Sequence, residues 1–125
     1  MSTRVLLIED NETTNFIHKF VLNKVGIVEI DEALNGLEAF NYLENNCPDI
    51  IFLDINMPVM DGWEFLKEKE LKALCKNSKI AMLTSSTRLE DREKAESYPS
   101  VIAYIEKPLT PDKFQDLKLK MGLYN

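Results

Sequence analysis

The sequence predicts an α/β fold in which a parallel sheet is covered by helices on both faces. Short apolar runs alternate along the chain with longer segments whose apolar residues recur at helical spacing. The most apolar run, residues 50–53, ends abruptly in Asp54 before a loop marked by Pro58 and Gly62, as a buried parallel strand does. The 125 residues suffice for one core, so we expect a single domain over residues 1–125 with no output domain.

Five apolar runs are the expected strands, and the second of them is the weakest: residues 5–8, 27–30, 50–53, 80–83 and 101–105. Strands that alternate with helices pair in parallel through right-handed crossovers, which places helices on both faces of the sheet.

The first expected helix follows the first strand and ends near Gly26, a C-terminal signal. The apolar residues at helical spacing are expected to face the core: Phe16, Ile17, Phe20, Val21 and Val25. The second helix begins at an Asn35 cap and is stopped by Pro48. Further helices are expected near residues 63–75 and 88–97, and Pro111 can start the last one.

Composition excludes several classes of function. A formal net charge of -6 argues against nucleic-acid binding, which needs a basic patch. No run has the length of a signal peptide or a membrane span, so we expect a cytoplasmic protein without a membrane partner. In that reducing compartment, and without metal-ligand spacing, Cys47 and Cys75 are expected to be free thiols.

Polar side chains follow four of the expected strands: Glu9 and Asp10, Asp54, Thr84 and Ser85, and Lys107. The carboxyl ends of parallel strands share one edge of the sheet, where ligands bind in open α/β folds. Three carboxylates there would repel one another unless cations are present, and oxygen ligands suit Mg²⁺. A metal, a lysine and a hydroxyl around Asp54 would serve phosphoryl transfer, with Asp54 as the nucleophile that forms an acyl phosphate.

These motifs resemble those of response-regulator receiver domains of two-component signalling, including the chemotaxis regulators. The resemblance covers nearly the whole chain and rests on four segments: Glu9-Asp10, residues 53–62, Thr84-Ser85 and residues 104–108. It implies the flavodoxin-like receiver fold, a doubly wound five-stranded parallel sheet with strand order 2-1-3-4-5.

The resemblance also implies a role for each matching residue. Asp54 would be the phospho-acceptor. The Mg²⁺ site would comprise Asp10, Asp54 and the backbone carbonyl of Asn56, with Glu9 acting on the metal through water.

Thr84 and Lys107 would bind the phosphoryl group. Tyr104 would be the aromatic switch residue that turns inward when Thr84 moves. Lys107-Pro108 would be the family's cis peptide bond.

Two positions depart from the family's pattern. Glu9 stands where many relatives have aspartate, which keeps the charge but adds a methylene. Tyr98-Pro99-Ser100-Val101 stands where relatives usually have a small residue or a glycine turn, next to the family's usual output surface.

We therefore expect a stand-alone receiver that accepts a phosphoryl group from a sensor histidine kinase or a histidine phosphotransfer protein. It would then change its affinity for an unidentified partner protein, and it would catalyse only its own phosphorylation and dephosphorylation. The alternative is a degenerate receiver that binds partners without phosphorylation. A phosphatase of the haloacid dehalogenase type is disfavoured because Asn56 replaces its acid, and a flavin binder because Glu9 to Glu12 would repel a phosphate.

Several residues have ordinary structural interpretations. His18 is expected to be a solvated side chain, and Lys67 to Glu70 a solvated helix face. Trp63 is expected to pack, and a hydroxyl among residues 84–87 is expected to cap the following helix.

Overall fold

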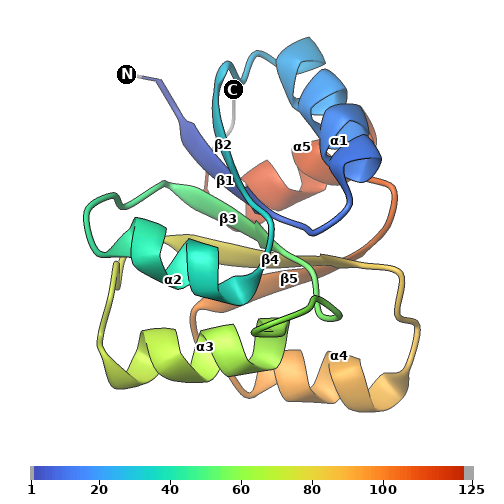
Figure 1. Cartoon of the computed structure of the whole chain (residues 1–125). Helices are drawn as coiled ribbons and strands as arrows, with labels where there is room; N and C mark the ends of the chain where they lie inside the picture. The colour runs from blue at the N-terminus through green and yellow to red at the C-terminus, as the bar shows by residue number, and fades with distance from the viewer. Residues whose placement is uncertain (1, 123–125) are drawn as a thin grey trace.

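A computed structural model describes residues 2–122, which form one parallel sheet between two layers of helices (Figure 1). The sheet has five strands in the order β2-β1-β3-β4-β5. The strands are β1 (Arg4–Ile8), β2 (Glu29–Ala33), β3 (Ile50–Leu53), β4 (Lys79–Thr84) and β5 (Val101–Glu106). The predicted fold class and strand order are confirmed.

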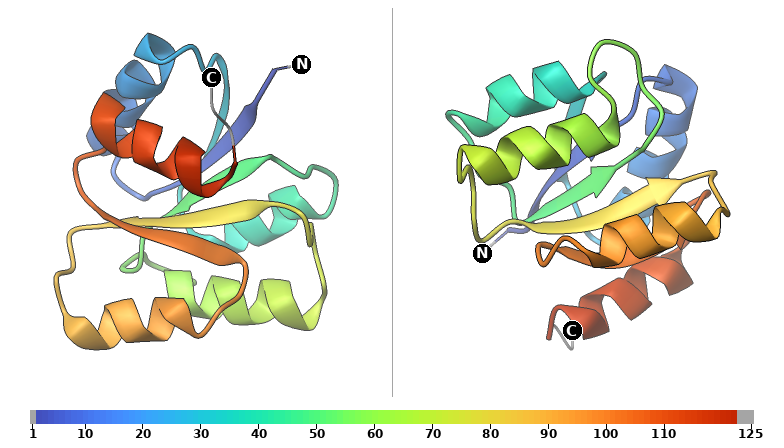
Figure 2. Two further views of the ribbon diagram at one scale, coloured as in Figure 1. Left: turned by 180° about the vertical axis from the view of Figure 1, so that it is seen from behind. Right: turned by 90° about the horizontal axis from the view of Figure 1, so that it is seen from below.

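Helices α1 and α5 cover one face of the sheet, and α2, α3 and α4 cover the other (Figures 1 and 2). The helices are α1 (Glu12–Lys24), α2 (Gly36–Leu43), α3 (Gly62–Leu71), α4 (Leu89–Glu96) and α5 (Pro111–Lys120). Within residues 2–122, no helix has the length and apolar character needed to cross a membrane.

Alternation along the central strands divides the core in two. Val5 and Leu7 of β1 pack in the cluster that contains Leu22 and Phe114, from α1 and α5. Leu6 and Ile8 pack in the second cluster, with side chains of α2, α3 and α4. Because both faces of β1 are buried, residues 5–8 are apolar without interruption, and this pattern allowed the strand to be predicted from the sequence.

Strand β2 lies later than its apolar run indicates. It spans Glu29–Ala33 rather than residues 27–30, and Val28 is exposed. As an edge strand it pairs only with β1, so it need not carry a continuous apolar run.

The predicted core face of α1 was wrong in part: Val21 and Val25 pack against the core as expected, but the other three apolar residues do not. Phe16, Ile17 and Phe20 are 71%, 47% and 55% exposed, whereas His18 and Leu22 are buried. The expectation that His18 is solvated was therefore also wrong. The helix has an apolar side and a mixed polar side, and the mixed side faces the sheet.

Two expectations about the second half of the chain were also wrong. Lys69, placed on a solvated face of α3, is only 2% exposed. No hydroxyl caps α4, whose N-cap is Arg88 without a side-chain hydrogen bond. The Ser86 hydroxyl instead donates to Asp91 at 2.5 Å and accepts from the Arg88 amide at 3.3 Å.

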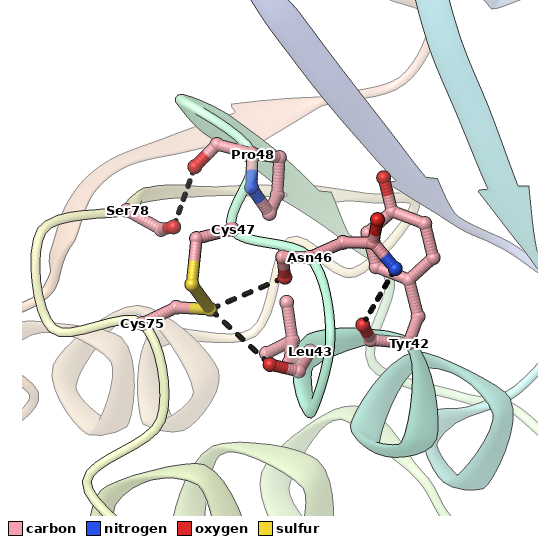
Figure 3. The surroundings of a disulfide bond; sticks show 7 residues. All are labelled: Tyr42, Leu43, Asn46, Cys47, Pro48, Cys75 and Ser78. Carbon is pink, nitrogen blue, oxygen red and sulfur yellow. Dashed lines mark hydrogen bonds between the residues drawn. A yellow bond between two sulfur atoms is a disulfide. The ribbon is translucent and has the colours of Figure 1, made fainter.

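Cys47 and Cys75 form a disulfide rather than the predicted free thiols (Figure 3). Their Cα atoms are 5.3 Å apart, although 28 positions separate them in the sequence. The bond joins the loop after α2 to the loop after α3, and Ser78 supports it by donating to the Pro48 carbonyl at 2.5 Å. Spacing along the chain carried no sign of this contact, because it depends on two loops that meet only in the fold.

Reduction of this disulfide is expected to lower the free energy of unfolding by about 3 to 4 kcal/mol, because it releases a closed loop in the unfolded chain. Urea unfolding with and without reductant measures the difference. A Cys47→Ser/Cys75→Ser variant is the control and should not respond to reductant. Two titratable thiols in the untreated protein, with unchanged unfolding, would contradict the assignment.

Candidate functional site

The carboxyl edge of the sheet holds the residues that follow β1 and β3. The Asp54 amide donates to the Ile8 carbonyl at 3.1 Å, and the Glu9 amide donates to the Ala33 carbonyl at 3.0 Å. Both bonds continue the strand ladders by one residue. The sheet itself therefore places the Glu9 and Asp54 side chains at the same edge.

Three carboxylates converge at this edge. Glu9, Asp10 and Asp54 each offer an oxygen, and these oxygens all lie within 4.8 Å of one another. Glu9 and Asp54 are buried, whereas Asp10 is exposed. A set of hard carboxylate oxygens, open to solvent on one side, suits a Mg²⁺ ion that keeps some of its water ligands.

Lys107 supplies the positive charge that these carboxylates require. Its ammonium forms an ion pair with Glu9, and its Nζ lies 3.2 Å from Asp54 Oδ2. Burial raises the pKa of Glu9 and the charge of Asp54 raises it further, while the hydrogen bond from Lys107 opposes both. Burial alone would lower the pKa of Lys107, but its bonds and charge interactions with Glu9 and Asp54 raise it above the ordinary value.

Asn15 holds the main chain at Glu9, a contact that sequence reasoning missed. Its side-chain amide donates to the Glu9 carbonyl at 3.0 Å, and the residue is 1% exposed. The Asn11 amide donates to Glu9 Oε2 at 3.1 Å. The sequence carries no signal for this contact, because it depends on which side of α1 faces the sheet.

The loop after β3 holds the Asp54 backbone closely. Gly62 begins α3 against the Asp54 carbonyl, and a Cβ at this position would overlap that oxygen. The Gly62 amide donates to the Ile55 carbonyl at 2.8 Å, and Asp61 caps the helix reciprocally with Glu64. Asp54 Oδ1 accepts from the Ile55 amide at 2.9 Å, which fixes one carboxylate oxygen.

Thr84 and Tyr104 lie on the neighbouring strands. Thr84 is buried at the end of β4, where its hydroxyl accepts from the Ser86 amide at 3.2 Å. The Tyr104 hydroxyl donates to the Ser86 carbonyl at 3.0 Å, and the Arg92 guanidinium lies 4.6 Å from the ring centroid.

The loop after β5 brings Lys107 to the cluster. The Lys107 amide donates to the Thr84 carbonyl at 2.9 Å, and the predicted cis bond to Pro108 is present. Asn56 lies exposed in the loop after Asp54.

Residues 5–117 match the family described as "Response regulator receiver domain". The chain belongs to this family. The receiver is 34% identical over 121 residues to "Two-component response regulator 24" of Arabidopsis thaliana, covering 95% of this chain and 84% of that protein. It is 27% identical over 116 residues to "Sporulation initiation phosphotransferase F" of Bacillus subtilis, covering 93% and 90%.

A solved structure, of a two-component response regulator from Cytophaga hutchinsonii, matches the receiver with a TM-score of 0.86 at 31% identity. The match covers 95% of this chain and 96% of that one. Other curated relatives are longer, and the receiver spans 30% of one and 48% of another. Activities of those longer proteins are therefore not assigned to it.

His18 adds a titratable group on the buried side of α1. Burial lowers its pKa from 6.5 to about 4, and the positive charge of Lys107 acts in the same direction. The unfolded imidazole thus takes up a proton at higher pH than the folded one does. The folded protein is therefore destabilised relative to the unfolded chain as the pH falls from the unfolded pKa of 6.5 to the folded pKa of about 4.

Between pH 7 and pH 4, the receiver should lose about 3 kcal/mol of stability relative to a His18→Leu variant. Urea unfolding of both proteins at several pH values gives this difference. His18 is the only histidine, so no second imidazole titrates in the same range. Parallel pH profiles for the two proteins would contradict a buried, neutral His18.

Proposed function

We propose that this receiver is a phospho-acceptor switch in which Asp54 takes a phosphoryl group from a histidine. One observation carries the proposal: Asp54 is a buried carboxylate at a strand end, within reach of Lys107 and two further carboxylates. Its Oδ1 accepts from the Ile55 amide and its Oδ2 faces the Lys107 ammonium, so the carboxylate is held in one orientation.

In the proposed reaction, an Asp54 carboxylate oxygen attacks the phosphorus of a phosphohistidine. The new P–O bond forms as the P–N bond breaks, and the leaving imidazole takes up a proton. Glu9, Asp10, Asp54 and the Asn56 carbonyl would hold Mg²⁺. When bound, this ion supplies positive charge that offsets the charge on the transferring oxygens.

Lys107 has the second electrostatic role. Its ammonium now balances Glu9 and Asp54, and its raised pKa keeps it charged. With a cation on the carboxylates, the same ammonium can pair with a phosphoryl oxygen on Asp54. Thr84, at the adjacent strand end, would donate its hydroxyl to another of these oxygens.

Phosphorylation of Asp54 would change the structure outside the site through Thr84 and Tyr104. Both side chains contact Ser86, one at its amide and the other at its carbonyl. Movement of the Thr84 hydroxyl toward the phosphoryl group would release the Ser86 amide and alter the contact that holds Tyr104. We propose that this changes affinity for a partner protein.

The phosphoryl donor would be a sensor histidine kinase or a histidine phosphotransfer protein, in the cytoplasm. A related protein of Bacillus subtilis bears the name of a phosphotransferase, which supports a place in a relay. The receiver would act on no other substrate and would catalyse only its own phosphorylation and dephosphorylation.

Incubation with acetyl phosphate and Mg²⁺ should add one phosphoryl group to the protein, and Asp54→Asn should abolish the addition. The amide cannot act as the nucleophile, while the fold around it is retained. Intact-mass spectrometry measures the adduct. Omission of Mg²⁺ with excess chelator is the first control and should also abolish it.

Asp49→Asn is the matched variant, because it removes a carboxylate at the opposite end of the same strand, where Asp49 accepts from the Arg4 amide. It should label like the wild type. Labelling that survives in Asp54→Asn would refute the assignment. Absence of labelling together with absence of Mg²⁺ binding would instead favour a receiver that acts without phosphorylation.

Asp10→Asn should weaken Mg²⁺ binding by about tenfold or more, because it removes one carboxylate ligand of a hard cation. Isothermal titration calorimetry with MgCl₂ measures the dissociation constants. Glu12→Gln removes the same charge two residues away and should change the affinity by less than about threefold, through screened attraction alone. Equal effects of the two substitutions would place the ion elsewhere.

A further inference from the structure

The structure contains a second charged site, at the edge of the sheet opposite Asp54. A pocket of about 250 Å³ lies where α3 ends and where β4 and β5 begin. Figure 1 shows that α3 runs away from the loop that follows β3, so that the two lie at opposite ends of the strands. The phospho-acceptor chemistry uses none of the residues that line it.

Lys69 is the unusual member of the pocket's lining. It is 2% exposed and lies one turn after the buried Phe65 and Leu66 of α3. It is the only lysine in residues 2–122 that is classed as buried. Lysine is almost never fully buried unless its ammonium is paired, because removing the charge from water costs several kcal/mol.

Within residues 2–122, no carboxylate forms an ion pair with the Lys69 ammonium and no acceptor forms a hydrogen bond with this group. The adjacent Glu70 is engaged elsewhere, since its carboxylate accepts from the Ser100 hydroxyl at 2.8 Å. Burial lowers the pKa of Lys69, while the charge of Glu70 opposes the shift. The fold thus holds a buried lysine side chain at the wall of a pocket, with no carboxylate at ion-pair distance from its amine.

The surroundings of Lys69 favour an anion. Lys76 and Lys79 also line the pocket, and Glu70 is the single acidic residue in the lining. This local excess of positive charge stands out in a chain whose net charge is -6. The pocket is smaller than the cavities of about 300 to 1,000 Å³ that hold drug-sized ligands, so a small ligand is indicated.

The pocket wall is held in place by covalent and polar contacts. Leu74 and Lys76 flank Cys75, whose disulfide ties this loop to Cys47 (Figure 3). Ser78 anchors the end of the same loop through its hydrogen bond to Pro48. A fixed wall keeps the three lysines near one another without a bound ligand, which lowers the entropy cost of binding.

We propose that this pocket binds a small phosphate-type oxyanion, with Lys69 as its buried counter-charge. Lysine is an established phosphate-binding residue that acts as a point charge and does not demand a planar ligand. A lysine that only covered apolar surface with its stem would be indifferent to such anions, and this difference can be measured.

The test is calorimetric titration of the whole chain with sodium pyrophosphate and, separately, with inorganic phosphate, in chelator so that no metal bridges the anion to Asp54. We expect saturable binding of at least one probe in the millimolar range or tighter. Lys69→Met keeps the length of the side chain and removes its charge, and it should weaken binding at least tenfold. Lys67→Met removes an exposed charge from the same helix and should change it by less than threefold.

Amide NMR spectra locate the site independently of affinity. Shifts induced by pyrophosphate should concentrate in residues 69–79 and 98–100 and should be small at Glu9, Asp10 and Asp54. No binding by the wild type, equal affinity in Lys69→Met, or shifts confined to the Asp54 edge would overturn the proposal. Its outcome is independent of whether Asp54 accepts a phosphoryl group, because no phosphoryl donor or Mg²⁺ is present.

Discussion

The repulsion among three carboxylates at one sheet edge is the constraint on which the site depends. Parallel pairing brings Glu9 and Asp54 together whatever their charge, since both follow directly from paired strands. Burial and the charge of Asp54 raise the pKa of Glu9, and repulsion between the carboxylates favours separation of the strand ends. Lys107, delivered by the loop after β5, reduces this cost, and its two ion pairs connect β1, β3 and β5 at their carboxyl ends.

This arrangement leaves the carboxylate cluster with less positive charge than negative charge. One ammonium faces three carboxylates, an excess of negative charge that a divalent cation would offset. A cation would in turn free Lys107 from its present partners. The same competition explains why the lysine follows a strand instead of sitting on a flexible surface helix: its Nζ must stay close to Asp54 in either state.

Much of the fold was predictable because buried parallel strands must be apolar on both faces. Residues 50–53 show this most clearly, and the polar residues that follow such strands predicted the site. The predictions failed where the fold breaks the usual division between apolar core and polar surface. On α1, Asn15 faces the sheet because the Glu9 carbonyl needs a donor, while Phe16 and Phe20 point outward. Periodicity identifies two faces of a helix, but a buried polar contact can decide which one is inside.

Lys69 and the cysteines were missed for a related reason. Each depends on a contact between loops that the sequence does not place side by side, at the amino-terminal edge of the sheet. There the end of α3, the loop that follows it and the residues just before β5 line the pocket at Lys69, and the disulfide ties that loop to the loop after α2. A charge buried without a counterion lowers stability, so a fold that retains one is expected to recover the loss through a ligand. The two edges of the sheet therefore carry opposite charge. The carboxyl edge has an excess of carboxylates, which suits a cation, and the amino-terminal edge has the Lys69 amine, which suits an anion.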